Sequence, residues 1–229
     1  MNIKENLLKV QENIENALIR SGRKNENIDI IAVTKTVDVD IINESISLGI
    51  NNIGENKVQE IKKKYDNIND DVNWHMIGHL QSNKVKYIID KVNLIHSLDR
   101  LSLAKEINKR AKAKDIVKDV LIQVNISEEK SKFGLKKEEV VPFIEKILEM
   151  KNIRVKGLMT MAPHVENPEE IRYVFRDLRN LGYKIENRNY ENIEMKYLSM
   201  GMSNDYEVAI EEGSNMVRLG TALFGKRIY

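Results

Sequence analysis

A lysine at the end of an apolar run is the first residue in this sequence whose position suggests chemistry. The run IIAVT at 30–34 leads directly into Lys35. Apolar surroundings favour the neutral form of an amine, and only a neutral amine attacks an aldehyde to form a Schiff base. The same position also suits a lysine whose ammonium group reaches out to solvent. Lys35 is therefore a candidate Schiff-base lysine, and the alternative of a lysine that extends into solvent stays open.

Two later segments carry small and hydroxyl residues of the kind that hold phosphate. LSMGMS at 198–203 ends in Ser203 just before a predicted helix, and RLGT at 218–221 ends in Gly220 and Thr221. Free backbone N–H groups at such turns bind anions, although Ser203 could simply cap its helix. The loops after the seventh and eighth strands of a β/α barrel often bind phosphate, and both segments fall there.

Arg218 is a charged residue inside an apolar strand. Alternation along the strand puts it on the same face as Met216 and Gly220. A guanidinium that faces a core needs a partner. That partner is either an acidic side chain or a ligand's ring nitrogen or phosphate, and the sequence leaves both open.

Other polar clusters follow the second and third predicted strands. They are GEN at 54–56 and GHLQSNK at 78–84, and they suit ordinary loops as well as a ligand site. His75 and His79 straddle a strand end without a third ligand at recognisable spacing, so we expect no metal site. The sequence contains no G-x-S-x-G elbow, P-loop or dinucleotide fingerprint.

These residues would be positioned by strands that alternate with helices. Eight strand-like runs occur, at Ile28–Thr34, Asn52–Gly54, Trp74–Gly78, Leu94–Ser97, Val120–Ile126, Arg154–Met161, Tyr197–Gly201 and Met216–Thr221. Helical patterns lie between them, at Val39–Leu48, Val58–Tyr65, Asn83–Ile89, Arg100–Ala113, Lys137–Met150, Pro168–Leu181 and Asn204–Glu211.

This alternation predicts an α/β fold with a parallel sheet, because parallel neighbours need crossover connections. Eight strands favour a closed (β/α)8 barrel of the TIM type, and an open doubly wound sheet is the alternative. An additional N-terminal helix at Ile3–Ile19 could cover the place of the eighth helix. No linker divides the chain, so residues 1–229 are expected to form a single barrel domain.

Composition narrows the class of protein. The 37 basic and 35 acidic residues nearly balance at +2, which argues against wholesale binding of nucleic acid. Basic runs at 62–64 and 109–118 fit solvated helix faces. There are no cysteines, which excludes disulfides and thiolate catalysis. No apolar run reaches the ~20 residues of a membrane span, and the N-terminus has no signal-peptide pattern. We expect a soluble, cytoplasmic protein.

Several longer motifs carry a resemblance that covers essentially the whole chain. They are AVTKT at 32–36, IGENKVQE at 53–60, WHMIGHLQSNK at 74–84, VNISEEKSKFG at 124–134, GLMTM at 157–161, LSMGMSNDYEVAI at 198–210 and GSNMVRLGTALFG at 213–225. With these motifs the chain resembles the pyridoxal-phosphate homeostasis protein family, whose barrel is similar to the N-terminal domain of alanine racemase.

The resemblance implies a cofactor and its binding residues. Lys35 would hold pyridoxal 5′-phosphate (PLP) as a Schiff base, and Arg218 would face the pyridine nitrogen. Asn56 would lie against the cofactor near the ring. Two further groups are implied: a phosphate grip of Ser203, Gly220 and Thr221, and a pocket lining of Ser199 and Met200.

Two positions qualify the resemblance. Some relatives carry a second lysine two positions after the Schiff-base lysine, where this chain has Val37. A role for that lysine in cofactor transfer therefore does not carry over. Lys132 in the SKFG segment matches another lysine of the family, for which the resemblance implies a secondary site.

The expected function is storage or delivery of PLP in vitamin B6 homeostasis rather than catalysis. An arginine at the ring nitrogen makes the cofactor a poor electron sink, because it repels a pyridinium. Racemases of similar fold add a tyrosine from a second domain, for which we see no room after the eighth strand. Apo PLP enzymes would be the recipients, and a monomer is expected. A slow amino-acid racemase, and an aldolase that uses Lys35 on a sugar phosphate, remain as alternatives.

Overall fold

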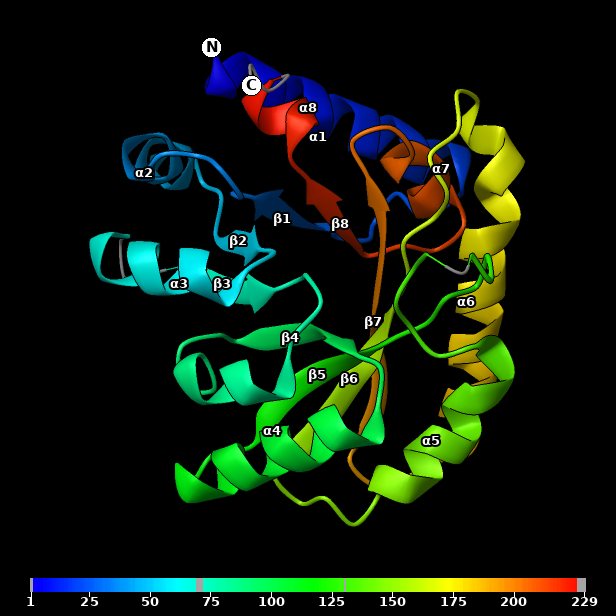
Figure 1. Ribbon diagram of the computed structural model, residues 1–229. Coiled ribbons are helices and arrows are strands. Elements are labelled where there is room, and N and C mark those ends of the chain that lie inside the picture. Colours follow the sequence, from blue (N-terminus) through cyan, green and yellow to red (C-terminus); the bar gives the residue numbers. More distant parts are fainter. Residues whose placement is uncertain (1, 69–71, 130, 226–229) are drawn as a thin grey trace.

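The computed structural model describes residues 2–68, 72–129 and 131–225. In this part of the chain eight parallel strands close into a barrel, in which β8 pairs with β1 (Figure 1). The closed barrel predicted from the sequence is confirmed, and the open sheet is excluded. The strands are β1 (Asp29–Val33), β2 (Asn52–Glu55), β3 (Asn73–Met76), β4 (Leu94–Leu98), β5 (Lys118–Gln123), β6 (Ile153–Met159), β7 (Ile193–Met202) and β8 (Met216–Leu219).

Helices surround the strands. The described α-helices are α1 (Ile3–Arg20), α2 (Val39–Ser47), α3 (Val58–Lys64), α4 (Leu101–Ala113), α5 (Val140–Ile147), α6 (Arg172–Glu186), α7 (Tyr206–Glu211) and α8 (Thr221–Phe224). Short 3-10 helices are η1 (Tyr65–Asn67), η2 (Ser82–Tyr87), η3 (Lys137–Glu139) and η4 (Pro168–Ile171). Among the described residues, no helix has both the length and the apolar character that crossing a bilayer requires.

The segment after β3 differs from the helix predicted at Asn83–Ile89. It forms the 3-10 helix η2 at Ser82–Tyr87, with hydrogen bonds between residues three apart, such as Lys84 N to Gln81 O at 2.9 Å. Runs this short gain little from α-helical propagation, so the tighter turn competes well.

The predicted helix at Pro168–Leu181 is also built differently. It opens as η4, where the Asn167 side chain accepts a hydrogen bond from Glu169 N at 3.2 Å. It then continues as α6 to Glu186, because the buried stripe of this helix extends to Ile185.

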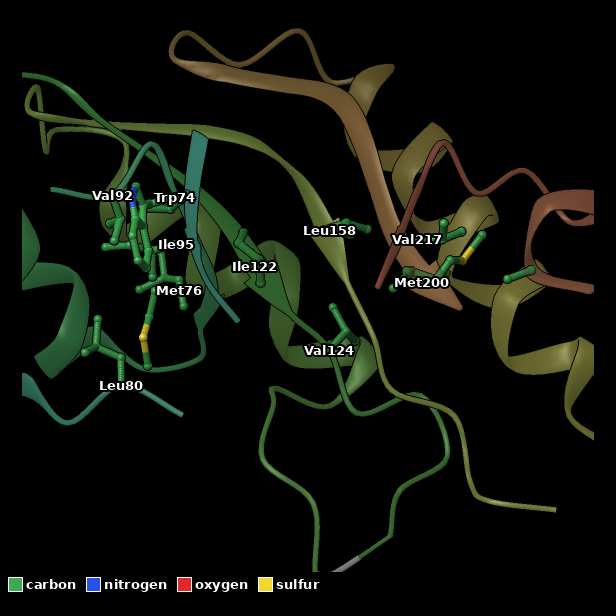
Figure 2. Packing of buried hydrophobic residues seen from close by; sticks show 14 of the residues in the cluster. Trp74, Met76, Leu80, Val92, Ile95, Ile122, Val124, Leu158, Met200 and Val217 are labelled. Carbon is green, nitrogen blue, oxygen red and sulfur yellow. The ribbon is translucent and has the colours of Figure 1, made fainter. Parts of the chain in front are cut away.

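The larger core lies between the barrel and the helices. Alternate residues of each strand point outward, and Trp74, Ile95 and Ile122 on successive strands belong to this cluster (Figure 2). Leu103 on α4 and Phe175 on α6 pack into it and are fully buried. This outer core explains why the strands carry apolar residues on both faces.

The inside of the barrel holds a second, smaller core. Its apolar members come from strands around the barrel and include Ile31, Leu94, Leu121, Met159 and Met216. The buried polar side chains of His96, Ser199 and Arg218 also lie inside the barrel, where hydrogen bonds join them.

Helix α1 closes the gap beside the last strand. Asn6 donates from Nδ2 to the Leu223 carbonyl at 2.8 Å, and Asn13 donates to the Tyr206 hydroxyl at 2.8 Å. Figure 1 shows α1 lying along α8 and α7. Since α8 is a single turn, α1 covers the place that a longer eighth helix would take, as predicted.

The packing of the outer core predicts the effect of removing one buried side chain of α6. Phe175→Ala should lower the free energy of unfolding by about 3–5 kcal/mol, because it removes a fully buried ring and leaves a cavity. Urea denaturation would measure the loss. Tyr173→Ala is the control, since Tyr173 lies on the same helix but is 51% exposed. Equal losses in the two variants would contradict this packing.

Candidate functional site

Four neighbouring strands end along one arc of the barrel mouth. They are β7, β8, β1 and β2, each paired with the next. Ser203, Gly220, Lys35 and Asn56 follow these strands in that order. Because all strands are parallel, their carboxyl ends share the same mouth. The fold therefore brings these four predicted site residues to one side of the barrel.

Lys35 follows β1 in a tight turn. Val37 N donates to the Thr34 carbonyl at 2.9 Å, and Thr36 takes a left-handed conformation with φ of 62°. The Lys35 side chain is partly buried and has no hydrogen bond or ion pair to any described residue. Its amine is thus available to a ligand.

A buried ion pair anchors the residue before Lys35. The Lys64 ammonium donates to Glu55 Oε1 at 2.8 Å and to the Thr34 carbonyl at 2.9 Å. The Thr34 hydroxyl donates to the same carboxylate oxygen at 2.7 Å. Glu55 is fully buried on the outer side of the barrel, so Thr34 is held there and alternation turns Lys35 towards the interior.

Asn56 lies against the end of β3. A Cβ at Gly78 would lie 2.2 Å from the Asn56 carbonyl oxygen, so only glycine allows this approach. The Asn56 side chain is partly buried and has no hydrogen bond within the described part of the chain. Its amide can therefore serve a ligand.

The turns after β7 and β8 are joined by a hydrogen bond. Ala222 N donates to Ser203 Oγ at 3.1 Å. Ser203 does not cap α7, which starts at Tyr206 after Asp205. The alternative that Ser203 caps its own helix is therefore wrong. Its hydroxyl oxygen instead accepts a hydrogen bond from the turn after β8.

The same two turns leave backbone donors open. The N–H groups of Gly220 and Thr221 have no hydrogen-bond acceptor among the described residues. Thr221 is exposed. Free amides and hydroxyls that are open to solvent suit a phosphate group.

Arg218 points into the barrel and is 4% exposed. Its guanidinium donates to the carbonyl oxygens of Ser199 and Thr160, each at 2.8 Å, and to the Ser199 hydroxyl at 2.7 Å. Burial lowers the pKa of Arg218 to about 10, an effect opposed by the nearby Asp205 carboxylate. No ion pair to Arg218 occurs in the described residues, so its bonded partners are neutral and not the acidic side chain considered from the sequence.

Two buried histidines extend this network across the barrel. His96 Nδ1 lies 3.0 Å from Ser199 Oγ, and His96 Nε2 lies 2.9 Å from His75 Nδ1. His75 Nε2 lies 3.3 Å from Asn52 Oδ1. Burial lowers the pKa of His75 to about 3. Burial, together with His75 and Arg218, lowers the pKa of His96 well below its usual range. Both rings are neutral at pH 7.

Met200 does not join the residues that converge on the mouth. Its side chain is fully buried in the outer core, near Val217 in Figure 2. Ser199 and Met200 are consecutive on β7, and Ser199 faces the interior, so Met200 must face outward. Of the two predicted lining residues, only Ser199 presents its side chain to the barrel interior.

Another histidine lies after β3. The His79 ring stacks on Phe133 with centroids 3.9 Å apart, and its Nδ1 is 3.6 Å from Asp99 Oδ2. Lys132, beside Phe133, pairs with Glu129 at 2.8 Å. In the described ranges no group of three or more His, Asp or Glu side chains is placed to hold a metal ion.

From the sequence, His96 was not identified and Glu55 appeared only within the polar cluster at 54–56. Lys64 was expected on a solvated helix face, which is wrong because Lys64 is buried. His96, Glu55 and Lys64 contact Ser199 or Thr34 across the fold. The only available signal was polar side chains inside apolar strands, such as His96 in the segment LIHSL.

Comparison with known proteins gives consistent results. The family model described as alanine racemase, N-terminal domain matches residues 6–227. The pyridoxal phosphate homeostasis protein of Aquifex aeolicus is 49% identical over 230 residues, covering 100% of both chains. The protein of the same name from Escherichia coli K12 is 38% identical over 232 residues, covering 99% of this chain and 97% of that one.

Solved structures agree with these relatives. PipY of Synechococcus elongatus, solved with PLP bound, is 27% identical with a TM-score of 0.85, covering 98% of this chain and 100% of that one. Alanine racemase of Clostridium difficile is 18% identical with a TM-score of 0.76. It covers 100% of this chain and 57% of the racemase, and at that identity it shows similarity of fold alone.

The buried histidines predict that acid weakens the fold. The unfolded chain takes up a proton on His75 near its ordinary pKa of 6.5, whereas the folded chain resists this until about 3. Stability is therefore lost as pH falls through this window, by about 2 kcal/mol at pH ~5 for one such histidine. Urea denaturation at about pH 7.5 and about pH 5 would measure it.

His75→Gln should lose less stability on acidification than the wild type, because it removes this group. His164→Gln is the control, since His164 is exposed and its replacement removes no buried imidazole. A pH dependence that is identical in His75→Gln and the wild type would contradict the neutral, buried state of His75.

Proposed function

Since this chain belongs to the pyridoxal phosphate homeostasis protein family, we propose that it binds PLP covalently through Lys35 and stores or delivers the cofactor. Lys35 would hold PLP as a Schiff base, which forms when its amine condenses with the aldehyde carbon and one water is released. In this proposal residues 1–229 serve as one PLP-binding domain.

The observation that carries the proposal is the position of the unpaired Lys35 amine. Lys35 shares an arc of the mouth with Asn56 and with the turns after β7 and β8. PLP carries an aldehyde and a phosphate on one small molecule. A site for it therefore needs an amine and an anion-binding group on the same side of the mouth. Ser203, Gly220 and Thr221 offer that grip through hydroxyl groups and free amides.

Arg218 argues for binding rather than catalysis. Bound PLP supplies an electron sink for carbanion chemistry when its ring nitrogen is protonated. A guanidinium that faces this nitrogen only donates hydrogen bonds and repels a second positive charge. Three of its five N–H bonds are used within the protein, which leaves donors for a ring nitrogen.

The protein acts as a cytoplasmic monomer, buffers free PLP and passes it to apo PLP-dependent enzymes. The absence of cysteine fits a reducing compartment. A slow amino-acid racemase is the alternative, and incorporation of solvent deuterium at the α-carbon of alanine by the pure protein would favour it.

Removal of the amine tests the proposal directly. Lys35→Ala should abolish borohydride-stable attachment of PLP, because no Schiff base can form at that position. Intact-mass analysis followed by peptide mapping would locate the adduct in the wild type. Lys57→Ala is the control, since Lys57 is exposed in the loop after β2 and should keep the label. Undiminished labelling of Lys35→Ala would assign the bond to another lysine.

The phosphate grip gives a second test. Thr221→Ala should weaken PLP affinity by about 1–1.5 kcal/mol, which is the scale of one lost hydrogen bond. Equilibrium titration followed by absorbance would measure the change. Thr221→Ser should restore affinity because it keeps the hydroxyl. An alanine variant as tight as the wild type would remove Thr221 from the site.

A further inference from the structure

A chain of hydrogen bonds crosses the barrel from Arg218 to the opposite end. It runs from the guanidinium to Ser199 Oγ, then through His96 and His75 to Asn52 Oδ1. Ser199 and His96 are 103 residues apart in sequence. The two strands that carry them, β7 and β4, are not neighbours in the barrel, so the chain spans the interior.

The direction of each hydrogen bond follows from Arg218. A guanidinium can only donate, so Ser199 Oγ accepts from Arg218. The single hydroxyl hydrogen of Ser199 must then go to its other neighbour, His96 Nδ1. That nitrogen therefore carries no hydrogen, and His96 is neutral with its hydrogen on Nε2.

The same reasoning assigns His75. His96 Nε2–H donates to His75 Nδ1, so His75 also carries its hydrogen on Nε2 and donates it to Asn52 Oδ1. The Asn52 oxygen accepts a second bond from Asn73 Nδ2 at 3.1 Å, which agrees with this direction. Every link is satisfied in one arrangement, in which all hydrogens point away from Arg218.

The opposite arrangement leaves a buried group unsatisfied. A hydrogen on His96 Nδ1 would make Ser199 Oγ accept from both sides, and its own hydroxyl hydrogen would have no acceptor among the described residues. A doubly protonated His96 would in addition place a cation beside Arg218. Both alternatives are costly because Ser199 and His96 are fully buried.

We propose that His96 and His75 are positioning residues for cofactor binding: they keep Ser199 an acceptor and so fix the guanidinium that faces the PLP ring. The proposal rests on the proposed function, because it concerns how Arg218 is held in the PLP site. Ser199 and Thr160 occupy three N–H bonds of Arg218. The N–H bonds that remain, on Nε and Nη2, keep one orientation towards a ligand.

Three variants test this role in the chain of 229 residues. His96→Leu cannot accept from Ser199 or donate to His75, and it should weaken PLP affinity about tenfold and shift the visible absorbance of the bound cofactor. His96→Gln keeps an amide that can do both, and it should recover most of the affinity. Leu121→Ala also weakens the barrel interior but removes no hydrogen bond of the chain, so it should lower thermal stability without shifting the absorbance.

A second measurement needs no cofactor. The ¹⁵N chemical shifts of His75 and His96 in PLP-free wild-type protein should report two neutral rings with hydrogen on Nε2. Hydrogen on His96 Nδ1, or a charged His96 ring at neutral pH, would overturn the proposal even if no variant folds. So would a folded His96→Leu protein that binds PLP with wild-type affinity and spectrum.

Failure of the proposed function is distinguishable from failure of this inference. A wild-type protein that never forms the Lys35 adduct would refute PLP binding, and the positioning role would fall with it. Normal labelling of the wild type, combined with unchanged affinity and absorbance in His96→Leu, would refute the positioning role alone.

Discussion

A buried cation without a bonded carboxylate is the constraint on which the site depends. Arg218 is 4% exposed, and within the described part of the chain only oxygen atoms of neutral groups accept its hydrogen bonds. Removing a guanidinium from water costs several kcal/mol unless strong dipoles replace the water. Carbonyl groups of Ser199 and Thr160 supply two such dipoles. The Ser199 hydroxyl, backed by the two histidine rings, supplies a third whose negative end faces the cation.

Much of the architecture follows from local pattern. Strands and helices alternate along the chain, and this pattern led to the barrel because crossover connections force parallel pairing. Lys35 and the turns after β7 and β8 were identified for the same reason, since residues that follow parallel strands share one mouth. The resemblance added Asn56 and Ser199, which the described structure places after β2 and inside the barrel.

What the sequence could not supply depends on contacts between distant segments. The bond between His96 and Ser199 needs the strands to close into a ring before it exists. The anchoring of Thr34 by Glu55 and Lys64 depends on where α3 packs. The outward direction of Met200 depends on the phase of β7, and a shift of one residue reverses it. Local propensity contains none of this information.

The contact between α1 and α8 bears on when the site is completed during synthesis. Asn6 bonds the Leu223 carbonyl across a separation of 217 residues. During synthesis, α1 therefore leaves the ribosome long before α8, the helix that it contacts in the folded protein. Lys35 emerges from the ribosome well before Arg218 and Thr221 do. A nascent chain can therefore expose the Lys35 amine before it contains the residues that are proposed to bind the phosphate after β8.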